Sequence, residues 1–288
     1  MSEEGTPHKR RGVVDIVFLI DATGSMEECI DALKANVNTL VNSISERSQQ
    51  NPVKDWRAKV VGFRDFLDTA YEPLVDNPFV KEPVAISSQL AALKAMGKNY
   101  LRLRCSNDGT VFSLDHAGPC DVCEELDCLH RFCLLHKIPV GGGVCSKCAR
   151  EPASLLDAIY HVANMGQTDK SAQELDPNKW RYRSHGIRVV IIFADATYHP
   201  TTKEGGTLDD ITLACTGNRI LLFIFAPELD CYDKLAEIDK SEYEAIEIMG
   251  GESAADALAR FTKQPEAFKL AMEQLGKSVS ASAAVEVL

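Results

Sequence analysis

The hydrophobic pattern begins with a β-branched run at residues 13–20, which read VVDIVFLI and are nearly all apolar. Such a run is too short for a buried helix and is typical of a central parallel strand covered on both faces. From Met26 apolar residues recur at steps of three and four, which predicts an amphipathic helix to about Arg47. The polar loop between the two elements completes the first half of a βαβ unit. In open α/β sheets ligands bind beyond the carboxyl ends of strands, so we expect the functional site at this loop.

Further strands and helices follow from the same periodicities. Strands are predicted at 56–66, 70–80 (an edge strand, weakened by Pro73 and Pro78), 189–193, 220–225 and 245–249, and helices at 87–96, 155–164, 208–215, 232–238 and 254–275, the last interrupted at Pro265. The polar stretch at 166–184 is predicted to be a surface loop. This alternation predicts a doubly wound, mostly parallel α/β sheet in the order 3-2-1-4-5-6.

The loop after the first strand carries the pattern D-x-T-x-S. Asp21, Thr23 and Ser25 alternate, so their side chains can point to one side of an irregular turn. One carboxylate and two hydroxyls form a hard-oxygen site of low negative charge, which suits Mg²⁺ and leaves the ion able to accept another anionic ligand. The alternative is that Thr23 or Ser25 only caps the following helix, with Asp21 at its positive end.

Two other strands are predicted to end at the same edge of the sheet. The buried strand at 189–193 is followed by Asp195, which in the predicted order faces Asp21 and would hold metal-bound water. The strand at 56–66 ends near Arg64 and Asp65, which either support the metal or form an ion pair with each other. His199 is a further candidate ligand, although a loop histidine more often binds nothing.

Three stretches resemble one known family. Residues 14–26, VDIVFLIDATGSM, resemble the opening of a von Willebrand factor A (vWA) domain with a metal-ion-dependent adhesion site (MIDAS). Residues 56–66, WRAKVVGFRDF, and 188–200, RVVIIFADATYHP, resemble the second and fourth strands of the bacterial-type branch associated with alpha-kinases and tellurium resistance. The resemblance implies a Rossmann-like fold and a Mg²⁺ or Mn²⁺ ion held by Asp21, Thr23, Ser25 and Asp195. It also implies that the ion takes a Glu or Asp side chain from a partner protein.

The chain departs from this family at the third metal loop. Arg150 stands where the resemblance leads us to expect an aspartate, and Ser154 or Glu151 is the available substitute. The metal site is therefore intact, rearranged or degenerate, and an arginine there could even replace the charge of the ion.

About fifty residues, 98–150, interrupt the vWA-like pattern and hold seven of the ten cysteines. Cys120, Cys123, Cys145 and Cys148 form two C-x-x-C knuckles, which together supply the four thiolates of a tetrahedral zinc site. A second zinc site would use Cys128, Cys133 and His136 with Cys105 or His130. The alternative is a set of buried free thiols. We expect one or two structural zinc ions, because a segment with so few large apolar residues needs them to fold.

Charge and composition narrow the possible partners. The net charge of −11 and the pI near 5.2 argue against nucleic-acid binding, and the insert has seven basic and six acidic residues without a basic stripe. We find no signal peptide and no run long enough to span a membrane. Ten cysteines without an export signal predict a reducing, cytoplasmic location.

These observations predict one vWA domain in two parts, residues 13–97 and 151–277, around a zinc-binding insert at 98–150, with flexible tails at 1–12 and 278–288. The predicted function is recognition of an acidic partner protein through Mg²⁺, with the zinc insert shaping the binding face and no enzymatic activity. One rival is a Mg²⁺-dependent hydrolase or phosphotransferase at the same strand ends, with His199 or Asp65 as its base. Another is a scaffold with a degenerate metal site. The sequence does not specify the oligomeric state.

Overall fold

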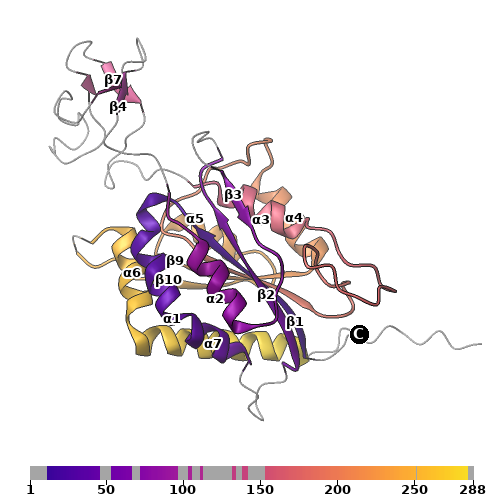
Figure 1. Ribbon diagram of the computed structural model, residues 1–288. Helices are drawn as coiled ribbons and strands as arrows, with labels where there is room; N and C mark the ends of the chain where they lie inside the picture. Colours follow the sequence, from indigo (N-terminus) through magenta and orange to yellow (C-terminus); the bar gives the residue numbers. More distant parts are fainter. Residues whose placement is uncertain are drawn as a thin grey trace, which may run out of the picture.

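The computed structural model describes residues 12–45, 53–66, 72–96, 153–250 and 252–284, and four short strands between 103 and 141. A six-stranded sheet runs in the order β10-β9-β8-β1-β2-β3 through the centre (Figure 1). Its strands are β1 (Val13–Asp21), β2 (Asp55–Phe63), β3 (Leu74–Asp76), β8 (Ile187–Phe193), β9 (Ile220–Pro227) and β10 (Glu242–Ile246). Only β3 is antiparallel to its neighbour in this sheet. The predicted mixed α/β fold with a mostly parallel sheet is confirmed.

Helices cover both faces of this sheet (Figure 1). One face packs against α1 (Glu27–Ser45), α2 (Pro83–Ala92), α6 (Ala254–Lys263) and α7 (Pro265–Ala284), and the other against α3 (Leu155–Ala163), α4 (Leu208–Asn218) and α5 (Asp230–Ala236). Side chains of a strand alternate between faces, so Phe18 and Ile20 of β1 enter the first core whereas Val17 and Leu19 enter the second. No helix in the described part of the chain is long and apolar enough to cross a membrane.

The position of β8 beside β1 was predicted and is confirmed. Ile20 of β1 pairs with Phe193, the last residue of β8, and on the other side Asp21 pairs with Phe63, the last residue of β2. Because these three parallel strands end at the same level, the residues that follow them share one edge of the sheet. We call it the carboxyl edge.

Some predicted boundaries are wrong. The second helix begins at Pro83 rather than at residue 87, because proline is well accommodated in the first turn of a helix. The last helix continues to Ala284, so residues 278–284 are helical although the sequence analysis placed them in the C-terminal tail. The alanines of this segment favour helix, and Val279 is buried against the core. The predicted surface loop at 166–184 contains Trp180, which is fully buried.

A buried ion network joins the strands at the opposite, amino end of the sheet. Asp15 near the start of β1 accepts hydrogen bonds from Nε and Nη2 of Arg57, both at 2.9 Å. It also receives the backbone N–H of Arg181 at 2.7 Å and pairs with the guanidinium of Arg181 at 2.9 Å. Arg181 reaches Asp55 at 2.8 Å as well. These contacts explain why the segment around Trp180 folds onto the sheet.

The cysteine-rich segment contributes a separate four-stranded antiparallel sheet, in the order β5-β4-β7-β6. The strands are β4 (Leu103–Cys105), β5 (Val111–Phe112), β6 (Phe132–Cys133) and β7 (Ile138–Gly141). In backbone register Cys105 pairs with Val140 and Cys133 with Ile138. The other predicted zinc ligands, Cys120, Cys123, Cys128, His136, Cys145 and Cys148, lie outside the described residues, as do Arg150 and Glu151. The zinc sites therefore stay a prediction.

Candidate metal site at the carboxyl edge

Asp21 is the last residue of β1, and its side chain is fully buried. Its Oδ1 accepts a hydrogen bond from the backbone N–H of Thr23 at 2.8 Å. Its Oδ2 is also buried and has no hydrogen-bond partner in the described part of the chain. A buried carboxylate oxygen left in this state is costly, so it points to a ligand, a cation or a proton at this position.

Asp195 lies next to Asp21, as the sequence predicted. It follows the end of β8 by two residues, and only 4% of it is exposed. Burial raises the pKa of Asp21, the charge of Asp195 raises it further, and the Thr23 N–H and hydroxyl lower it, which leaves the pKa at about 8. Two carboxylates that disfavour each other's ionisation are the electrostatic arrangement that a bound divalent cation relieves.

Thr23 precedes the short 3-10 helix Gly24–Met26, which contains Ser25 and leads into α1. Thr23 occupies the N-cap position with extended backbone dihedrals, but its side chain makes no capping hydrogen bond. Its hydroxyl lies 3.2 Å from that of Ser25, which is exposed. The capping alternative is therefore wrong for Thr23, whereas two adjacent hydroxyls beside Asp21 match the predicted oxygen ligands.

Arg64 fixes the backbone around Asp21. It is 5% exposed and donates to three backbone carbonyls: Nε to Ala22 at 3.2 Å, Nη1 to Glu72 at 2.8 Å and Nη2 to Lys94 at 2.8 Å. The carbonyl of Ala22 also accepts the N–H of Met96 at 2.8 Å. The positive charge of Arg64 lowers the pKa of Asp21 and so favours its ionised form. Arg64 thus holds the backbone of the loop after β1, and within the described part of the chain its guanidinium donates to backbone carbonyls rather than to Asp65.

A second polar cluster lies at the same edge, and the sequence did not predict its contacts. His199 Nε2 lies 3.2 Å from Asp65 Oδ1, and the hydroxyl of Ser154 donates to the same oxygen at 3.4 Å. The Ser154 hydroxyl also accepts the N–H of Phe66 at 2.8 Å. Ser154, the suggested substitute for the third metal-loop ligand, is therefore held by the loop after β2. Ser154 and His199 both contact the carboxylate rather than each other, so the cluster lacks the order of a Ser-His-Asp triad.

Backbone hydrogen bonds join the loops of the carboxyl edge. The N–H of Ala153 donates to Thr197 at 2.8 Å and the N–H of His199 donates to Ala153 at 3.1 Å, so the segment before α3 lies along the segment after β8. The hydroxyl of Tyr232 donates to the carbonyl of Ala196 at 2.5 Å. The sequence could have indicated this arrangement through the positions of these segments, because each directly follows a parallel strand or precedes a helix.

The donor set is one that selects a hard cation. No group of three or more His, Cys, Asp or Glu side chains suited to a metal is found among the described residues. The candidate site combines two carboxylates with two hydroxyls, and it contains no thiolate or imidazole. Mg²⁺ binds through one or two carboxylates and keeps several waters, so these residues fit Mg²⁺ or Mn²⁺ better than zinc or copper.

Comparisons with known proteins add little to this picture. No family model and no curated protein matches the chain. Among solved structures, proximal thread matrix protein 1 from the mussel byssus is 12% identical with a TM-score of 0.41, over 91% of this chain and 46% of that one. The pilus adhesin SpaC from Lactobacillus rhamnosus GG is also 12% identical, with a TM-score of 0.40, over 90% of this chain and 30% of that one. The chain thus spans less than half the length of either, and likenesses this low carry no argument.

Proposed function

We propose that the carboxyl edge holds a Mg²⁺ or Mn²⁺ ion and that a carboxylate from a partner protein completes its coordination. Asp21, Thr23 and Ser25 would bind the ion, and Asp195 would orient its water. The observation that carries this proposal is the buried Oδ2 of Asp21, which has no hydrogen-bond partner in the described part of the chain. The resemblance of the loop to a vWA adhesion site gives the same assignment.

The low charge of the site supports a protein partner that offers Glu or Asp. Two carboxylates only neutralise a divalent ion, and the nearby Arg64 adds positive charge. An ion held in this way still attracts an anionic ligand at its open position. Because Ser25 and part of the loop are accessible, a partner side chain can reach the edge without unfolding it.

For the cysteine-rich segment we propose structural zinc, held by the two C-x-x-C knuckles and, for a second ion, by the remaining cysteines with His136. Closed four-ligand zinc sites leave no position for a substrate, so the role of this segment is to hold its fold and shape the binding face. Elemental analysis of purified protein tests the proposal by its zinc content, with one or two equivalents expected and none contradicting it.

Calorimetric titration of Mg²⁺ and of Mn²⁺ into zinc-replete protein tests the metal edge. We expect binding with a Kd of about 1 mM or tighter, from a site with few charged ligands. Asp21→Asn keeps the shape of the side chain and should abolish binding. Asp31→Asn removes an exposed carboxylate from α1, the helix that follows the Asp21 loop, and should leave binding unchanged. Absence of binding to the unmodified protein would leave the edge a metal-free contact surface and favour the scaffold alternative.

The contact between His199 and Asp65 favours one second candidate, a Mg²⁺-dependent hydrolase or phosphotransferase at the same edge. A histidine oriented by a carboxylate is a suitable general base, and it lies four residues after Asp195. Phosphatase and nucleotidase substrates tested with Mn²⁺ separate this candidate from partner binding. Turnover that disappears in His199→Gln but survives in Lys269→Gln would establish an enzyme.

A further inference from the structure

Three buried arginines surround one buried carboxylate at the amino end of the sheet. Asp15 of β1 lies in register between Arg57 of β2 and Arg188 of β8, and residues in register on neighbouring strands point to the same face. Arg57 and Arg181 both pair with Asp15, and Arg181 also pairs with Asp55. The three arginines are at most 4% exposed. Both carboxylates are therefore engaged by the first two arginines, and Arg188 forms no ion pair with a described residue.

The guanidinium of Arg188 donates only to neutral oxygens within the described part of the chain. Its Nη2 reaches the carbonyl of Arg181 at 2.9 Å and the side-chain oxygen of Gln167 at 2.8 Å, and its Nη1 reaches the carbonyl of Asn218 at 3.3 Å. Its Nε is buried and has no hydrogen-bond partner among the described residues. Asn218 ends α4, and the partial charge of a helix end, about half an elementary charge, does not balance a guanidinium.

Two exposed arginines, Arg183 and Arg219, lie beside this guanidinium. The backbone N–H of Arg183 donates at 3.2 Å to the same oxygen of Gln167 that Nη2 of Arg188 reaches. Arg219 directly follows Asn218, whose carbonyl contacts Nη1. Its φ of 56° is a left-handed conformation that usually favours glycine or asparagine, so the backbone does not account for an arginine at this position.

Like charges therefore act on Arg188. Burial lowers its pKa, Asp15 raises it, and the charges of Arg183 and Arg219 lower it, which leaves the pKa at about 10. An arginine keeps its proton at neutral pH, so its burial is not relieved by neutralisation. We call Arg183, Arg188 and Arg219 the arginine cluster. None of the three forms an ion pair with a residue that the structure describes, so a bound anion is what would balance their charge.

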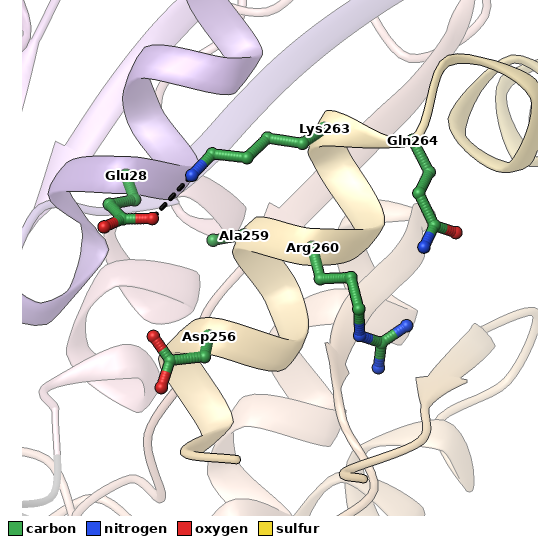
Figure 2. A pocket seen from close by; sticks show the side chains of 6 residues that line it. All are labelled: Glu28, Asp256, Ala259, Arg260, Lys263 and Gln264. Atoms are coloured by element: carbon green, nitrogen blue, oxygen red, sulfur yellow. Dashed lines mark hydrogen bonds and ion pairs between the residues drawn. The ribbon is translucent and has the colours of Figure 1, made fainter.

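The cations of α6 show the usual arrangement, in which each cation has a carboxylate partner. Figure 2 shows Lys263 reaching from α6 to Glu28 on α1, and Arg260 pairs with Glu252 at 3.0 Å. A hollow of about 370 Å³ lies between α1 and α6, but its lining also includes the carboxylate of Asp256. An anion would have to displace or approach carboxylates there, whereas the arginine cluster has no paired carboxylate among the described residues.

We propose that the arginine cluster binds a phosphate group. One phosphate oxygen takes the place of the Gln167 side chain at Nη2 of Arg188, and the guanidiniums of Arg183 and Arg219 donate to the other oxygens. Three guanidiniums without carboxylates favour an anion of more than one negative charge, and their planar donors match phosphate oxygens. Gln167 is exposed, as are the two outer arginines, so the ligand reaches the cluster from solvent.

This inference is independent of the proposed function. Arg188 is the second residue of β8, so the arginine cluster lies at the amino end of the sheet, whereas Asp195 follows the other end of the same strand. Phosphate binding at the cluster needs no metal ion. A failure of the metal site therefore leaves this inference standing, and the reverse also holds.

Calorimetric titration of inorganic phosphate into the full chain tests the inference, without Mg²⁺ and with sodium chloride keeping the ionic strength constant. We expect saturable binding with a Kd of about 1 mM, from a few charge-assisted hydrogen bonds. Arg183→Gln and Arg219→Gln each remove one exposed charge and should each weaken binding about threefold to fivefold. Arg188→Gln should abolish binding. The two exposed variants decide the question if this buried substitution prevents folding.

The control is Lys263→Gln, which removes an exposed cation that already has a carboxylate partner. It should bind phosphate as the unmodified protein does. Titration with glycerol 3-phosphate identifies the source of the phosphate group: a similar affinity indicates part of a larger molecule, and an affinity about tenfold weaker indicates the free ion. Absence of saturable binding up to about 20 mM phosphate overturns the inference. Equal affinity in Arg183→Gln, Arg219→Gln and the unmodified protein also overturns it.

Discussion

The strand β1 carries a buried aspartate near each end, and the two are treated in opposite ways. Asp15 is 1% exposed and Asp21 is fully buried, so the protein has withdrawn both carboxylates from water. Asp15 is held by Arg57 and Arg181, and each of its oxygens accepts at least two hydrogen bonds or ion-pair contacts. Asp21 accepts the backbone N–H of Thr23 and faces the like charge of Asp195, and its Oδ2 has no hydrogen-bond partner in the described part of the chain.

This difference separates a structural carboxylate from a candidate ligand. A buried charge that is fully paired holds chain segments together, since the loss of one partner leaves the other uncompensated. A buried carboxylate beside another one destabilises the fold unless something else is bound. The burial of a carboxylate alone therefore does not indicate a binding site. A buried carboxylate with too few hydrogen-bond or ion-pair partners does indicate one.

The largest change in stability is expected for a substitution near the amino end of β1. Asp15→Asn removes the charge that Arg57 and Arg181 share and should lower the free energy of unfolding by about 3–5 kcal/mol, the usual cost of breaking a buried ion pair. Urea denaturation followed by circular dichroism measures the loss. A loss below 1 kcal/mol would mean that the two arginines find other partners and that the network is not what holds the segment around Trp180.

The corresponding substitution at the other end of β1, Asp21→Asn, should stabilise the protein rather than destabilise it. In EDTA at pH 7.5, Asp21 is mostly protonated in the folded protein, where its pKa is about 8, but ionised in the unfolded chain. Asp21→Asn removes this difference in protonation and should raise the free energy of unfolding by about 1–2 kcal/mol. The same urea assay applies. A loss as large as that of Asp15→Asn would show that Asp21 is a structural carboxylate after all.

The pH dependence of the free energy of unfolding also distinguishes the unmodified protein from Asp21→Asn. The pKa of Asp21 is raised from 3.8 to about 8 in the folded protein, so between these values the unfolded chain gives up its proton more readily. The contribution of Asp21 to the free energy of unfolding is therefore greatest below pH 4 and falls as the pH rises towards 8. Asp21→Asn should remove this part of the slope. An identical slope in both proteins would contradict the assignment.

The sequence allowed more of the carboxyl edge to be predicted than of the amino end. Asp21 and Asp195 each directly follow a short apolar strand, so strand polarity and sheet order alone bring them together. Asp15 and Arg181 are 166 positions apart, and Arg181 lies in a polar stretch whose composition resembles a surface loop. Local periodicity contains no signal for such a pairing, since only the folded chain brings the two residues into contact.

The contact between His199 and Asp65 was missed for a related reason. Both residues were recognised as lying at the carboxyl edge, but their pairing depends on how two loops of irregular structure run past each other. The hydrogen bonds of Ala153 to the segment after β8 set that path. Strand order thus predicts which loops meet, whereas side-chain pairs within those loops require coordinates.

A fourth prediction concerns the ion itself. At a Mg²⁺ concentration ten times its Kd, binding to the native state alone raises the free energy of unfolding by about 1.4 kcal/mol. Zinc-replete protein should show this gain in urea denaturation, and so should Asp31→Asn. Asp21→Asn should show no gain. Mg²⁺ should therefore remove the stability difference between the unmodified protein and Asp21→Asn. An equal gain in Asp21→Asn would indicate that Mg²⁺ binds at another place.

The smallest effect on stability is expected for Ser25→Ala. If Ser25 serves the helix start, its loss should cost about 1 kcal/mol, as for a lost cap, and leave Mg²⁺ binding unchanged. Its hydroxyl is exposed and lies 3.2 Å from Thr23 Oγ1, and such surface substitutions usually change stability by less than about 0.5 kcal/mol. We therefore expect nearly unchanged unfolding in EDTA but Mg²⁺ binding weakened severalfold in calorimetry, because an oxygen ligand is lost. A stability loss of about 1 kcal/mol with unchanged Mg²⁺ binding would instead assign Ser25 to the helix start. The proposed metal ligands would then be Asp21, Thr23 and Asp195.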